Sequence, residues 1–480
     1  MTYKATIGLE IHAELRTRSK MFCESRNNAD EEVPNMNICP VCLGHPGTLP
    51  VINREAVRQV LRVGVALASN LADYTEFDRK NYFYPDLPKG YQISQYQYPL
   101  VSGGTLHGIP ITRIHLEEDT ASSIHNDSTG ETLIDYNRAG VPLMELVTEP
   151  DIHSAEQAGS FARELQVLLR YLGASNANME KGEMRVEANI SVAPEGELGT
   201  KVEVKNLNSF RAMERAIKYE ISRQSERLAS GGTVVQQTLG WDEGAQKTFP
   251  QRIKEGSADY RYFPDPDLPS LKLSDVESFT RSELERTLPE LPWARRERYV
   301  GLGLKSDDAE QYVNEPVLGD YFDAVSEILA SDRKLQLIAS NYIANDLTML
   351  MRDVANRDTD IHYKIPISHS NFAALIGLVG NGRISSRGAK DILAAMVVED
   401  GDPEGIAEQK GLLIRTDGGA IDTTIEEILS KNLTVVSDYK SGKEAALQFL
   451  IGQCMRALKG AVDPTTLKQK LIEQISRVEK

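Results

Sequence analysis

The chain has 480 residues, of which 26% are charged and 41% hydrophobic, and its formal net charge at pH 7 is −16. This balance is typical of a folded globular protein and excludes a largely disordered chain. The negative charge excludes a protein that coats nucleic acid non-specifically, because it would repel phosphates at long range, although a local basic surface could still hold a folded RNA.

No membrane association is expected. The apolar runs are too short to span a bilayer, and the N-terminal residues form neither an apolar signal segment nor an Arg/Ser-rich transit pattern. Four cysteines are too few for a disulfide scaffold. The sequence therefore favours a cytoplasmic protein.

The first predicted element is a strand over residues 7–15, with the sequence IGLEIHAEL. Apolar and polar residues alternate along it, which is the pattern of a half-buried strand. One face carries aliphatic side chains and requires a core. The other face carries His12 between Glu10 and Glu14, so it presents an imidazole flanked by two carboxylates.

Two helices are predicted among the short strands of the first 290 residues. One follows Ser154, with Gln157 three residues later as a capping box and Gly173 as a C-terminal cap. The other begins at Ser209 and ends before Gly231. Alternating or β-branched runs predict strands at residues 188–192, 201–207 and 233–239.

Changes in composition divide the chain into three predicted domains. Residues 1–290 combine helix and strand signals, and a proline-marked joint, TLPELPW, closes this part. Residues 291–400 are helical in period, and the Gly/Pro-rich stretch EDGDPEG precedes a small helical tail over residues 401–480. The predicted fold class is α+β: a mixed α/β body with an antiparallel sheet, followed by a helical middle domain and the tail.

Five segments of the first domain combine carboxylates, amides and cations on short strands or loops. They are residues 77–95, 113–125, 135–151, 182–192 and 201–211. Any one of these charged side chains, taken alone, is more often merely solvated. Together they indicate a site for metal-bound polyphosphate, because a sheet brings such segments side by side. Carboxylates hold Mg²⁺, an imidazole can complete the metal's ligand set, and cations neutralise phosphoryl oxygens.

Several common nucleotide-binding and hydrolase motifs are absent. The sequence has no G-x-x-x-x-G-K-[ST] loop, no G-x-G-x-x-G after a strand, no G-x-S-x-G elbow and no H-E-x-x-H. A nucleotide site would therefore be of an uncommon kind. From the residues alone, a metal-dependent phosphoesterase or nuclease explains the same carboxylates equally well.

These segments closely resemble the family of B subunits of aspartyl/glutamyl-tRNA amidotransferases. The matching motifs are IGLEIHAEL, CPVCLGHPGTLPVIN, FDRKNYFYPDLPKGYQISQ, HLEED, DYNRAGVPLMELVTEPD, MRVEANISV, GTKVEVKNLNSFRAMERAI, DYRYFPDPDLP and, in the tail, FLIGQCMRALKGAVDP. The resemblance covers nearly the whole chain.

The resemblance implies a specific reaction. Such a subunit transfers the γ-phosphoryl group of ATP to the side-chain carboxylate of misacylated Glu-tRNA(Gln) or Asp-tRNA(Asn), giving an acyl phosphate. An amidase (glutaminase) subunit supplies the ammonia that displaces the phosphate, and a small third subunit braces the heterotrimer. The expected cofactor is Mg²⁺, with ATP as substrate.

The resemblance also implies site residues. His12, Glu118 and Glu145 are expected to be catalytic and to hold Mg²⁺, with Glu10 as a weaker ligand in the same site. The cations expected to contact phosphate or carboxylate groups are Lys80, Arg138 and Lys205. The tail resembles the tRNA-contacting domain of the family, and the basic residues of its amphipathic helix region are Lys440, Lys443, Arg456 and Lys459.

A zinc site is a further implication of the resemblance. Many members carry C-x-C followed by C-x-x-C, and here Cys23, Cys39 and Cys42 are present while Ser25 replaces the second cysteine. Tetrahedral zinc requires four ligands. His45 could supply the fourth; alternatively, the three thiols lie in a loop that folds without metal.

Two other functions stay open. A metal-dependent phosphoesterase or nuclease would act on phosphoesters without ATP. A non-catalytic scaffold would bind tRNA and show no ATP hydrolysis when misacylated tRNA is added.

Overall fold

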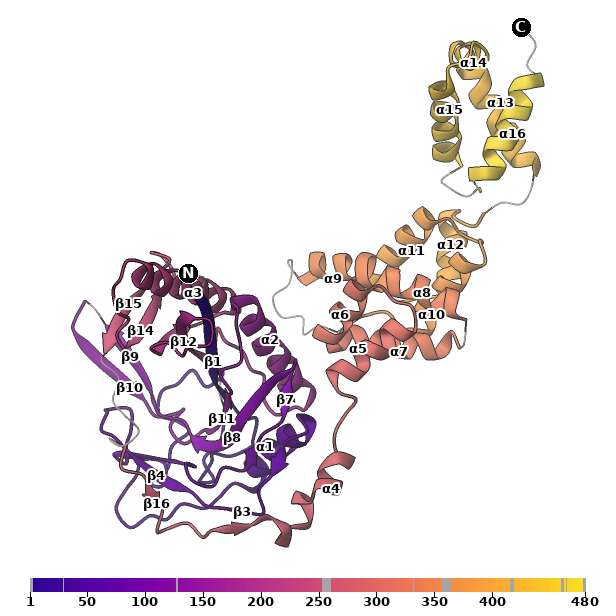
Figure 1. The fold of residues 1–480 in the computed structure, drawn as a ribbon. Coiled ribbons are helices and arrows are strands. Elements are labelled where there is room, and N and C mark those ends of the chain that lie inside the picture. Colours follow the sequence, from indigo (N-terminus) through magenta and orange to yellow (C-terminus); the bar gives the residue numbers. More distant parts are fainter. Residues whose placement is uncertain are drawn as a thin grey trace. The chain divides into compact units, whose positions relative to one another are not determined.

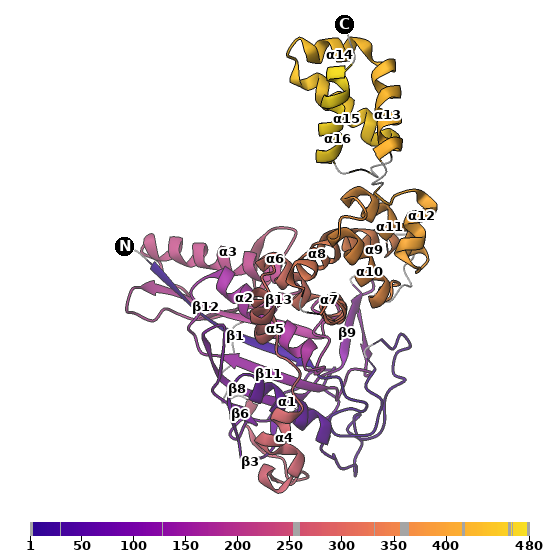
Figure 2. The same cartoon turned by 90° about the vertical axis from the view of Figure 1, so that its right-hand side faces the viewer.

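The computed structural model describes residues 3–28, 30–126, 128–252, 260–330, 332–355, 364–414, 418–458, 462 and 464–477. The chain divides into two compact units, Met1–Pro292 and Trp293–Lys480. Every described strand lies in the first unit, and the described part of the second is helical (Figures 1 and 2). This is the α+β class that the sequence predicts. The division falls close to the predicted joint at residue 290, and the three-domain scheme stays a prediction.

The first unit is built on a ten-stranded sheet in the order β15-β14-β13-β12-β1-β11-β8-β6-β2, with β7 paired to β8. Its strands are β1 (Tyr3–Glu14), β2 (Asn70–Leu71), β6 (Val101–Ser102), β7 (Thr105–Leu106), β8 (Ile109–Glu118), β11 (Pro142–Thr148), β12 (Met184–Pro194), β13 (Val202–Leu207), β14 (Thr238–Asp242) and β15 (Lys247–Arg252). All described pairs of this sheet are antiparallel except β13–β14. The sequence therefore correctly predicts an antiparallel sheet.

β1 lies in the middle of this sheet and shows the predicted alternation. Ile7, Leu9 and Ile11 are at most 1% exposed, whereas the polar residues between them are half-buried. Burial of one face of the strand fixes its register, because a slip by one residue would move the aliphatic side chains into solvent. The polar face of β1 is consequently held in one position relative to β11 and β12.

Three helices pack against the sheet: α1 (Arg54–Ala66), α2 (Ala155–Tyr171) and α3 (Phe210–Ala229). Helices α2 and α3 begin where the sequence predicts. The hydroxyl of Ser154 accepts a hydrogen bond from the N–H of Gln157, and that of Ser209 accepts one from the N–H of Ala212, each at 3.1 Å. Gly173 follows α2 with φ +64°, the left-handed conformation of a helix C-terminal cap.

Smaller elements complete the first unit. A three-stranded sheet has the order β16-β4-β5. The remaining elements are β3 (Tyr74–Thr75), β4 (Asp78–Asn81), β5 (Tyr91–Ser94), β9 (Ser122–Asn126), β10 (Glu131–Asp135), β16 (Phe263–Pro264), β17 (Leu271–Lys272), η2 (Leu273–Asp275), η3 (Glu277–Phe279) and α4 (Arg281–Arg286). The strand predicted at residues 233–239 begins only at Thr238, where pairing with β13 starts.

The second unit follows the helical period of its sequence. Its elements are α5 (Pro292–Gly301), α6 (Ser306–Asn314), α7 (Pro316–Ile328), α8 (Arg333–Asn341), the π-helix η4 (Tyr342–Leu347), α9 (Thr348–Ala355), α10 (His369–Gly380), α11 (Ser386–Val398), α12 (Pro403–Lys410), α13 (Gly418–Lys431), α14 (Leu433–Lys440), α15 (Glu444–Ala457) and α16 (Pro464–Arg477). None of the described helices of the chain combines the length and apolar character needed to cross a bilayer.

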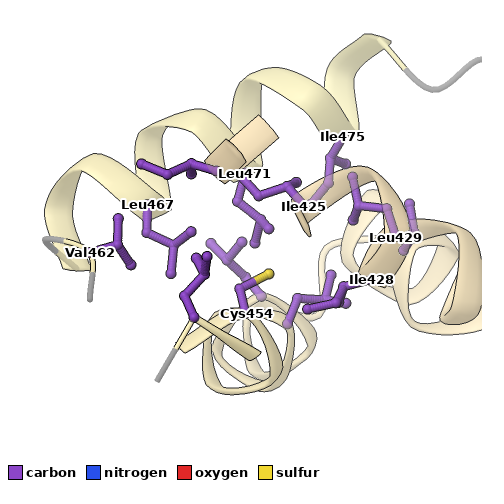
Figure 3. Close-up of a cluster of buried hydrophobic side chains, with 13 residues drawn as sticks. Ile425, Ile428, Leu429, Cys454, Val462, Leu467, Leu471 and Ile475 are labelled. Atoms are coloured by element: carbon purple, nitrogen blue, oxygen red, sulfur yellow. The ribbon is translucent and has the colours of Figure 1, made fainter. Parts of the chain in front are cut away.

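The last four helices share a cluster of buried side chains, here called the tail cluster (Figure 3). It consists of Ile421, Ile425, Ile428, Leu429, Val436, Leu447, Leu450, Cys454, Leu458, Val462, Leu467, Leu471 and Ile475. Cys454 is fully buried in the cluster, so it acts as a core residue there.

We predict that Leu471→Ala destabilises the tail cluster by about 2–5 kcal/mol, because it removes a fully buried side chain and leaves a cavity. If residues 401–480 form a separate domain, amide hydrogen exchange should accelerate in α13, α15 and α16 and stay unchanged in α7 and α10. Equal acceleration in both sets would contradict the predicted boundary at residue 400.

Candidate active site

The pairing of β1 with its neighbours places four polar side chains in a row on one face of the large sheet. His12 on β1 lies opposite Glu145 on β11 and opposite Arg185 on β12. Glu145 in turn lies opposite His115 on β8. Directly opposed side chains in an antiparallel pair have Cβ atoms about 5 Å apart, so this row concentrates imidazoles, a carboxylate and a guanidinium.

His12, Glu117 and Glu145 lie close enough to share a metal ion, and we call them the His–Glu trio. The Nε2 atom of His12 is 3.2 Å from Oε2 of Glu145 and 3.6 Å from Oε1 of Glu117. Oε1 of Glu10 is 3.9 Å from the same nitrogen. The structure thus brings together three of the four predicted Mg²⁺ ligands, namely His12, Glu145 and Glu10.

The fourth predicted ligand, Glu118, is not in this group, and its neighbour Glu117 takes that place. Adjacent residues on a strand point to opposite faces. Oε1 of Glu118 is 2.6 Å from Nζ of Lys89 and accepts a 2.9 Å hydrogen bond from the N–H of Ile93. Glu118 therefore stabilises the contact between β8 and β5, and the expectation that it lies with His12 and Glu145 is corrected by the structure.

His115 belongs to the surroundings of the trio, although the sequence pattern alone did not single it out. Its Nε2 atom is 3.5 Å from Glu145 and 3.8 Å from Glu117. The residue is only 3% exposed, and its Nδ1 atom has no hydrogen-bond partner among the described residues. The alternation of HLE within β8 places His115 and Glu117 on the same face, so this signal could have identified both residues.

A second potential metal group adjoins the trio and shares His12 with it. Glu10, His12 and Glu187 each offer a ligand atom within 4.8 Å of the others. The ammonium of Lys205, predicted to contact phosphate or carboxylate, lies 2.7 Å from Glu187. This lysine therefore stands at the edge of the site, where it balances the charge of the second group.

The carboxylates determine the protonation of His12. Burial alone would lower the pKa of this imidazole, but a hydrogen bond to Glu145 and the charges of Glu145, Glu117 and Glu10 raise it to about 9. Burial and the nearby charges of Glu145 and Glu187 raise the pKa of Glu10 to about 7. Without a metal, the trio is therefore held together by an imidazolium between carboxylates.

Lys80, the next of the predicted cations, is influenced by two carboxylates of the trio. Burial alone would lower the pKa of this ammonium, but the charges of Glu117, Tyr262 and Glu145 raise it above its ordinary value. Its Nζ atom also lies 5.1 Å from the ring centroid of Tyr260. Lys80 is thus kept charged next to the carboxylates.

Arg138 lies in a polar cluster around Asp119, which adjoins the row of His12 through Arg185. Its guanidinium is 3.7 Å from Asp119 and donates hydrogen bonds to the carbonyls of Thr120 (3.0 Å) and Ala121 (2.8 Å). Arg185 contacts the same carboxylate at 2.5 Å. Several donors of Arg138 are therefore engaged in holding the segment after β8, and the structure does not bring this residue to the trio.

The donor set of the trio suits a divalent cation. Two carboxylates supply hard oxygen atoms, which Mg²⁺ prefers, and an imidazole can supply one nitrogen. The Nδ1 atom of buried His115 has no hydrogen-bond partner among the described residues, so the polar interactions of this site are incomplete there. The residues present therefore fit the metal that the sequence leads us to expect.

The three cysteines form another potential metal group. One sulfur atom from each of Cys23, Cys39 and Cys42 lies within 4.8 Å of the others. The hydroxyl of Ser25 and the ammonium of the fully buried Lys20 are each 3.8 Å from Sγ of Cys42. This clustering is compatible with a bound metal ion.

His45 is not part of the cysteine group. It lines the same hollow as Cys23 and Cys42, but its side chain is exposed and it does not belong to the metal group found among the described residues. The polar groups that contact the thiol of Cys42 include those of Ser25 and Lys20. The geometry therefore does not support the expectation that His45 completes a zinc site.

Comparisons with known proteins identify the family of the chain. A family model described as "GatB/GatE catalytic domain" matches residues 5–278, and one described as "GatB domain" matches residues 320–475. The chain belongs to the GatB family. The first match contains every candidate site residue named above, and the second contains the tail cluster.

Curated relatives match the GatB-family chain over nearly its full length. It is 42% identical over 488 residues to a protein of Thermoanaerobacter pseudethanolicus, which covers 99% of this chain and 100% of the relative. It is 44% identical over 479 residues to a protein of Thermus thermophilus, covering 98% and 99%. Both relatives are named as the B subunit of aspartyl/glutamyl-tRNA(Asn/Gln) amidotransferase. The GatB-family chain thus belongs among the tRNA-dependent amidotransferases of protein biosynthesis, and the name of its relatives implies further subunits.

We predict that the His12 imidazole of the metal-free GatB-family chain titrates near pH 9, because Glu145 and Glu117 stabilise its charged form. Glu145→Gln should lower this pKa by roughly 1 to 3, since it removes an adjacent opposite charge. NMR of protein with labelled histidine measures both values. A His12 pKa near 6.5 in the unchanged protein would contradict the geometry of the trio.

We also predict that Ser25→Cys increases zinc retention to about one ion per chain, because the new thiol lies beside Cys42 and supplies a fourth ligand. Elemental analysis after dialysis against a chelator measures this. The matched control is Cys39→Ser in the same background, which should abolish the gain. Equal zinc content with serine or cysteine at position 25 would show that this residue faces no metal.

Proposed function

We propose that this chain is the ATP-dependent subunit of a cytoplasmic tRNA amidotransferase. It phosphorylates the side-chain carboxylate of misacylated Glu-tRNA(Gln), Asp-tRNA(Asn) or both. Ammonia from a partner glutaminase subunit then gives Gln-tRNA(Gln) or Asn-tRNA(Asn). The observation that carries the proposal is the convergence of His12, Glu117 and Glu145, beside the charged Lys80, in a chain of the GatB family.

The chemistry requires activation of the substrate carboxylate. A carboxylate oxygen of the aminoacyl group attacks the γ-phosphorus of ATP, the bond to the bridging oxygen breaks, and ADP leaves. Ammonia next attacks the acyl carbon, and inorganic phosphate departs with the C–O bond electrons while one proton is lost. Neither substrate carboxylate nor ammonia must be deprotonated before it attacks, so no general base is assigned.

In this proposal the trio holds Mg²⁺, with Glu10 as an additional carboxylate at its edge. When bound, the cation would neutralise charge on the transferred phosphoryl group. The contacts of His115 and Arg113 with Glu145 keep these side chains oriented before the substrate binds. Such preorganisation reduces the rearrangement needed during reaction.

The lysines supply complementary positive charge. Lys80 remains charged beside Glu117 and Glu145, where it can contact phosphoryl oxygens or the substrate carboxylate. Lys205 lies 2.7 Å from Glu187, a member of the second potential metal group described above. We assign Arg138 a weaker role in binding phosphate or carboxylate, because carbonyl groups and Asp119 already engage its guanidinium.

The proposed assembly is a heterotrimer with the glutaminase subunit and a small bracing subunit, and the tail contacts the tRNA by recognition of its shape. The tail residues offer limited support from charge. The ammonium of Lys443 lies 2.9 Å from Asp438, and Lys459 lies outside the described residues. The proposal for the tail consequently depends on the family match at residues 320–475.

We predict that Glu117→Gln lowers ATP-dependent amidation by on the order of 100-fold or more, because it removes one charged ligand from the site of charge build-up. The assay follows glutamine- and ATP-dependent conversion of Glu-tRNA(Gln) and Asp-tRNA(Asn) by the assembled enzyme. Hydroxylamine trapping of the acyl phosphate reports the first step separately.

The comparison variant is Glu118→Gln, which removes the ion pair with Lys89 but leaves the trio intact. It should lower thermal stability and retain more acyl-phosphate formation than Glu117→Gln. The reverse order of activities would mean that Glu118 is the ligand after all. Phosphoester hydrolysis without ATP, or tRNA binding without any ATP hydrolysis, would support the phosphoesterase or the scaffold instead.

A further inference from the structure

Five tyrosines form a continuous belt of rings beside the His–Glu trio. In spatial order they are Tyr84, Tyr82, Tyr260, Tyr262 and Tyr96, and we call them the tyrosine belt. Successive ring centroids are 6.0, 5.9, 6.1 and 4.3 Å apart. Offset and edge-to-face contacts at these separations stabilise aromatic pairs. The belt is therefore an ordered surface that the phosphoryl-transfer chemistry does not by itself require.

The belt tyrosines come from two segments that are far apart in sequence, residues 82–96 and residues 260–262. The small sheet holds these two segments together. β16 pairs with β4, with Phe263 opposite Arg79 (Figure 1). The side-chain amide of Asn81 donates hydrogen bonds to the carbonyls of Tyr260, at 3.2 Å, and Arg261, at 2.9 Å. These contacts hold residues 260–264 against residues 78–81.

Lys80 connects the belt to the trio. Its Nζ atom is 5.1 Å from the ring centroid of Tyr260 and 5.9 Å from that of Tyr82. The same ammonium is attracted by the carboxylates of Glu117 and Glu145. A molecule lying on the belt next to Lys80 therefore reaches the place where the proposed reaction occurs.

The Tyr84 end of the belt is open to solvent. Phe83 is 86% exposed, Tyr84 54% and Phe263 44%. These residues, together with Tyr260, Asn81 and Arg261, line a hollow of about 910 Å³. Large aromatic side chains gathered at such exposure mark a binding surface, because scattered single exposed residues are the usual case in a monomeric protein.

An unpaired nucleobase fits this surface. Every base has a flat π face that stacks on aromatic side chains, and nearby cations hold the backbone phosphates. Lys80 and Arg261 supply positive charge at the belt of a chain whose net charge is −16. The aminoacyl group that must reach the trio is an ester on the terminal ribose of tRNA, so the nucleotides next to that ester must lie on whatever surface adjoins the trio.

We propose that Phe83 and Tyr84, supported by Tyr82 and Tyr260, form a stacking shelf for an unpaired base at the 3′ end of the substrate tRNA. The shelf thereby directs the aminoacyl side chain to the trio. This inference rests on the proposed function, because it takes a misacylated tRNA as the substrate. To that function it adds the residues that bind the 3′ end of the tRNA.

The test measures the dissociation constants of the full-length chain for two RNAs without ATP: an uncharged tRNA and the same tRNA lacking its unpaired 3′ nucleotides. Phe83→Ala and Tyr84→Ala should each weaken binding of the intact tRNA by roughly 5- to 100-fold, the range of base–aromatic stacking. Binding of the shortened tRNA should stay unchanged. Phe83→Tyr keeps an aromatic ring and should retain the affinity for intact tRNA.

Phe249→Ala is the matched control, since Phe249 is also an exposed aromatic residue, 40% accessible, but lies on β15 at the far edge of the large sheet. It should leave both affinities unchanged. Because Phe83 is almost fully exposed, its truncation should not change the thermal unfolding temperature of the protein.

Three results would overturn the inference. Equal weakening of both RNAs would place the shelf against another part of the tRNA. A weaker affinity for ATP, with tRNA binding unchanged, would assign the shelf to the adenine of ATP. Loss of co-purification with the glutaminase subunit, with both RNA affinities unchanged, would make it a protein-docking surface. These binding measurements need no turnover, so failure to form an acyl phosphate would count against the proposed function alone.

Discussion

The register in which β1 pairs with β11 and β12 is the constraint on which the candidate site depends. The aliphatic face of β1 is almost completely buried, and a shift by one residue would expose it. In the observed register His12 lies opposite Glu145, and Glu10 lies opposite Glu187. Packing of apolar side chains on one face of the sheet thus determines which ionisable groups meet on the other.

The buried carboxylates of this site are tolerated because positively charged side chains lie next to them. Isolated buried carboxylates would be strongly destabilised. Here burial acts to raise the pKa of Glu145, but the nearby positive charges of His115, His12 and Lys80 lower it below its ordinary value. The same carboxylates that hold His12 and Lys80 in their charged forms are the oxygen donors that could bind a metal ion.

The small β16-β4-β5 sheet contributes what the large sheet lacks. It places Lys80 and the tyrosine belt beside the trio, and the hydroxyl of Ser94 on β5 donates a 3.0 Å hydrogen bond to Glu117. The large sheet therefore supplies the acidic groups, and the small one supplies a cation and an aromatic surface. A site of this composition can face an anionic phosphate and a flat base at the same time.

Local patterns in the sequence determined the strand at residues 7–15, the starts of α2 and α3, the helical character beyond residue 290 and the polar segments that form the site, because alternation and capping act over a few residues. Motif resemblance identified the family. Only the tertiary structure decided that Glu117 and not Glu118 joins His12, that His115 accompanies it, that Arg138 binds carbonyl groups and that His45 stays outside the cysteine group. Those outcomes depend on strand register and on contacts between distant segments; the alternation of HLE indicates only that His115 and Glu117 share one face of their strand.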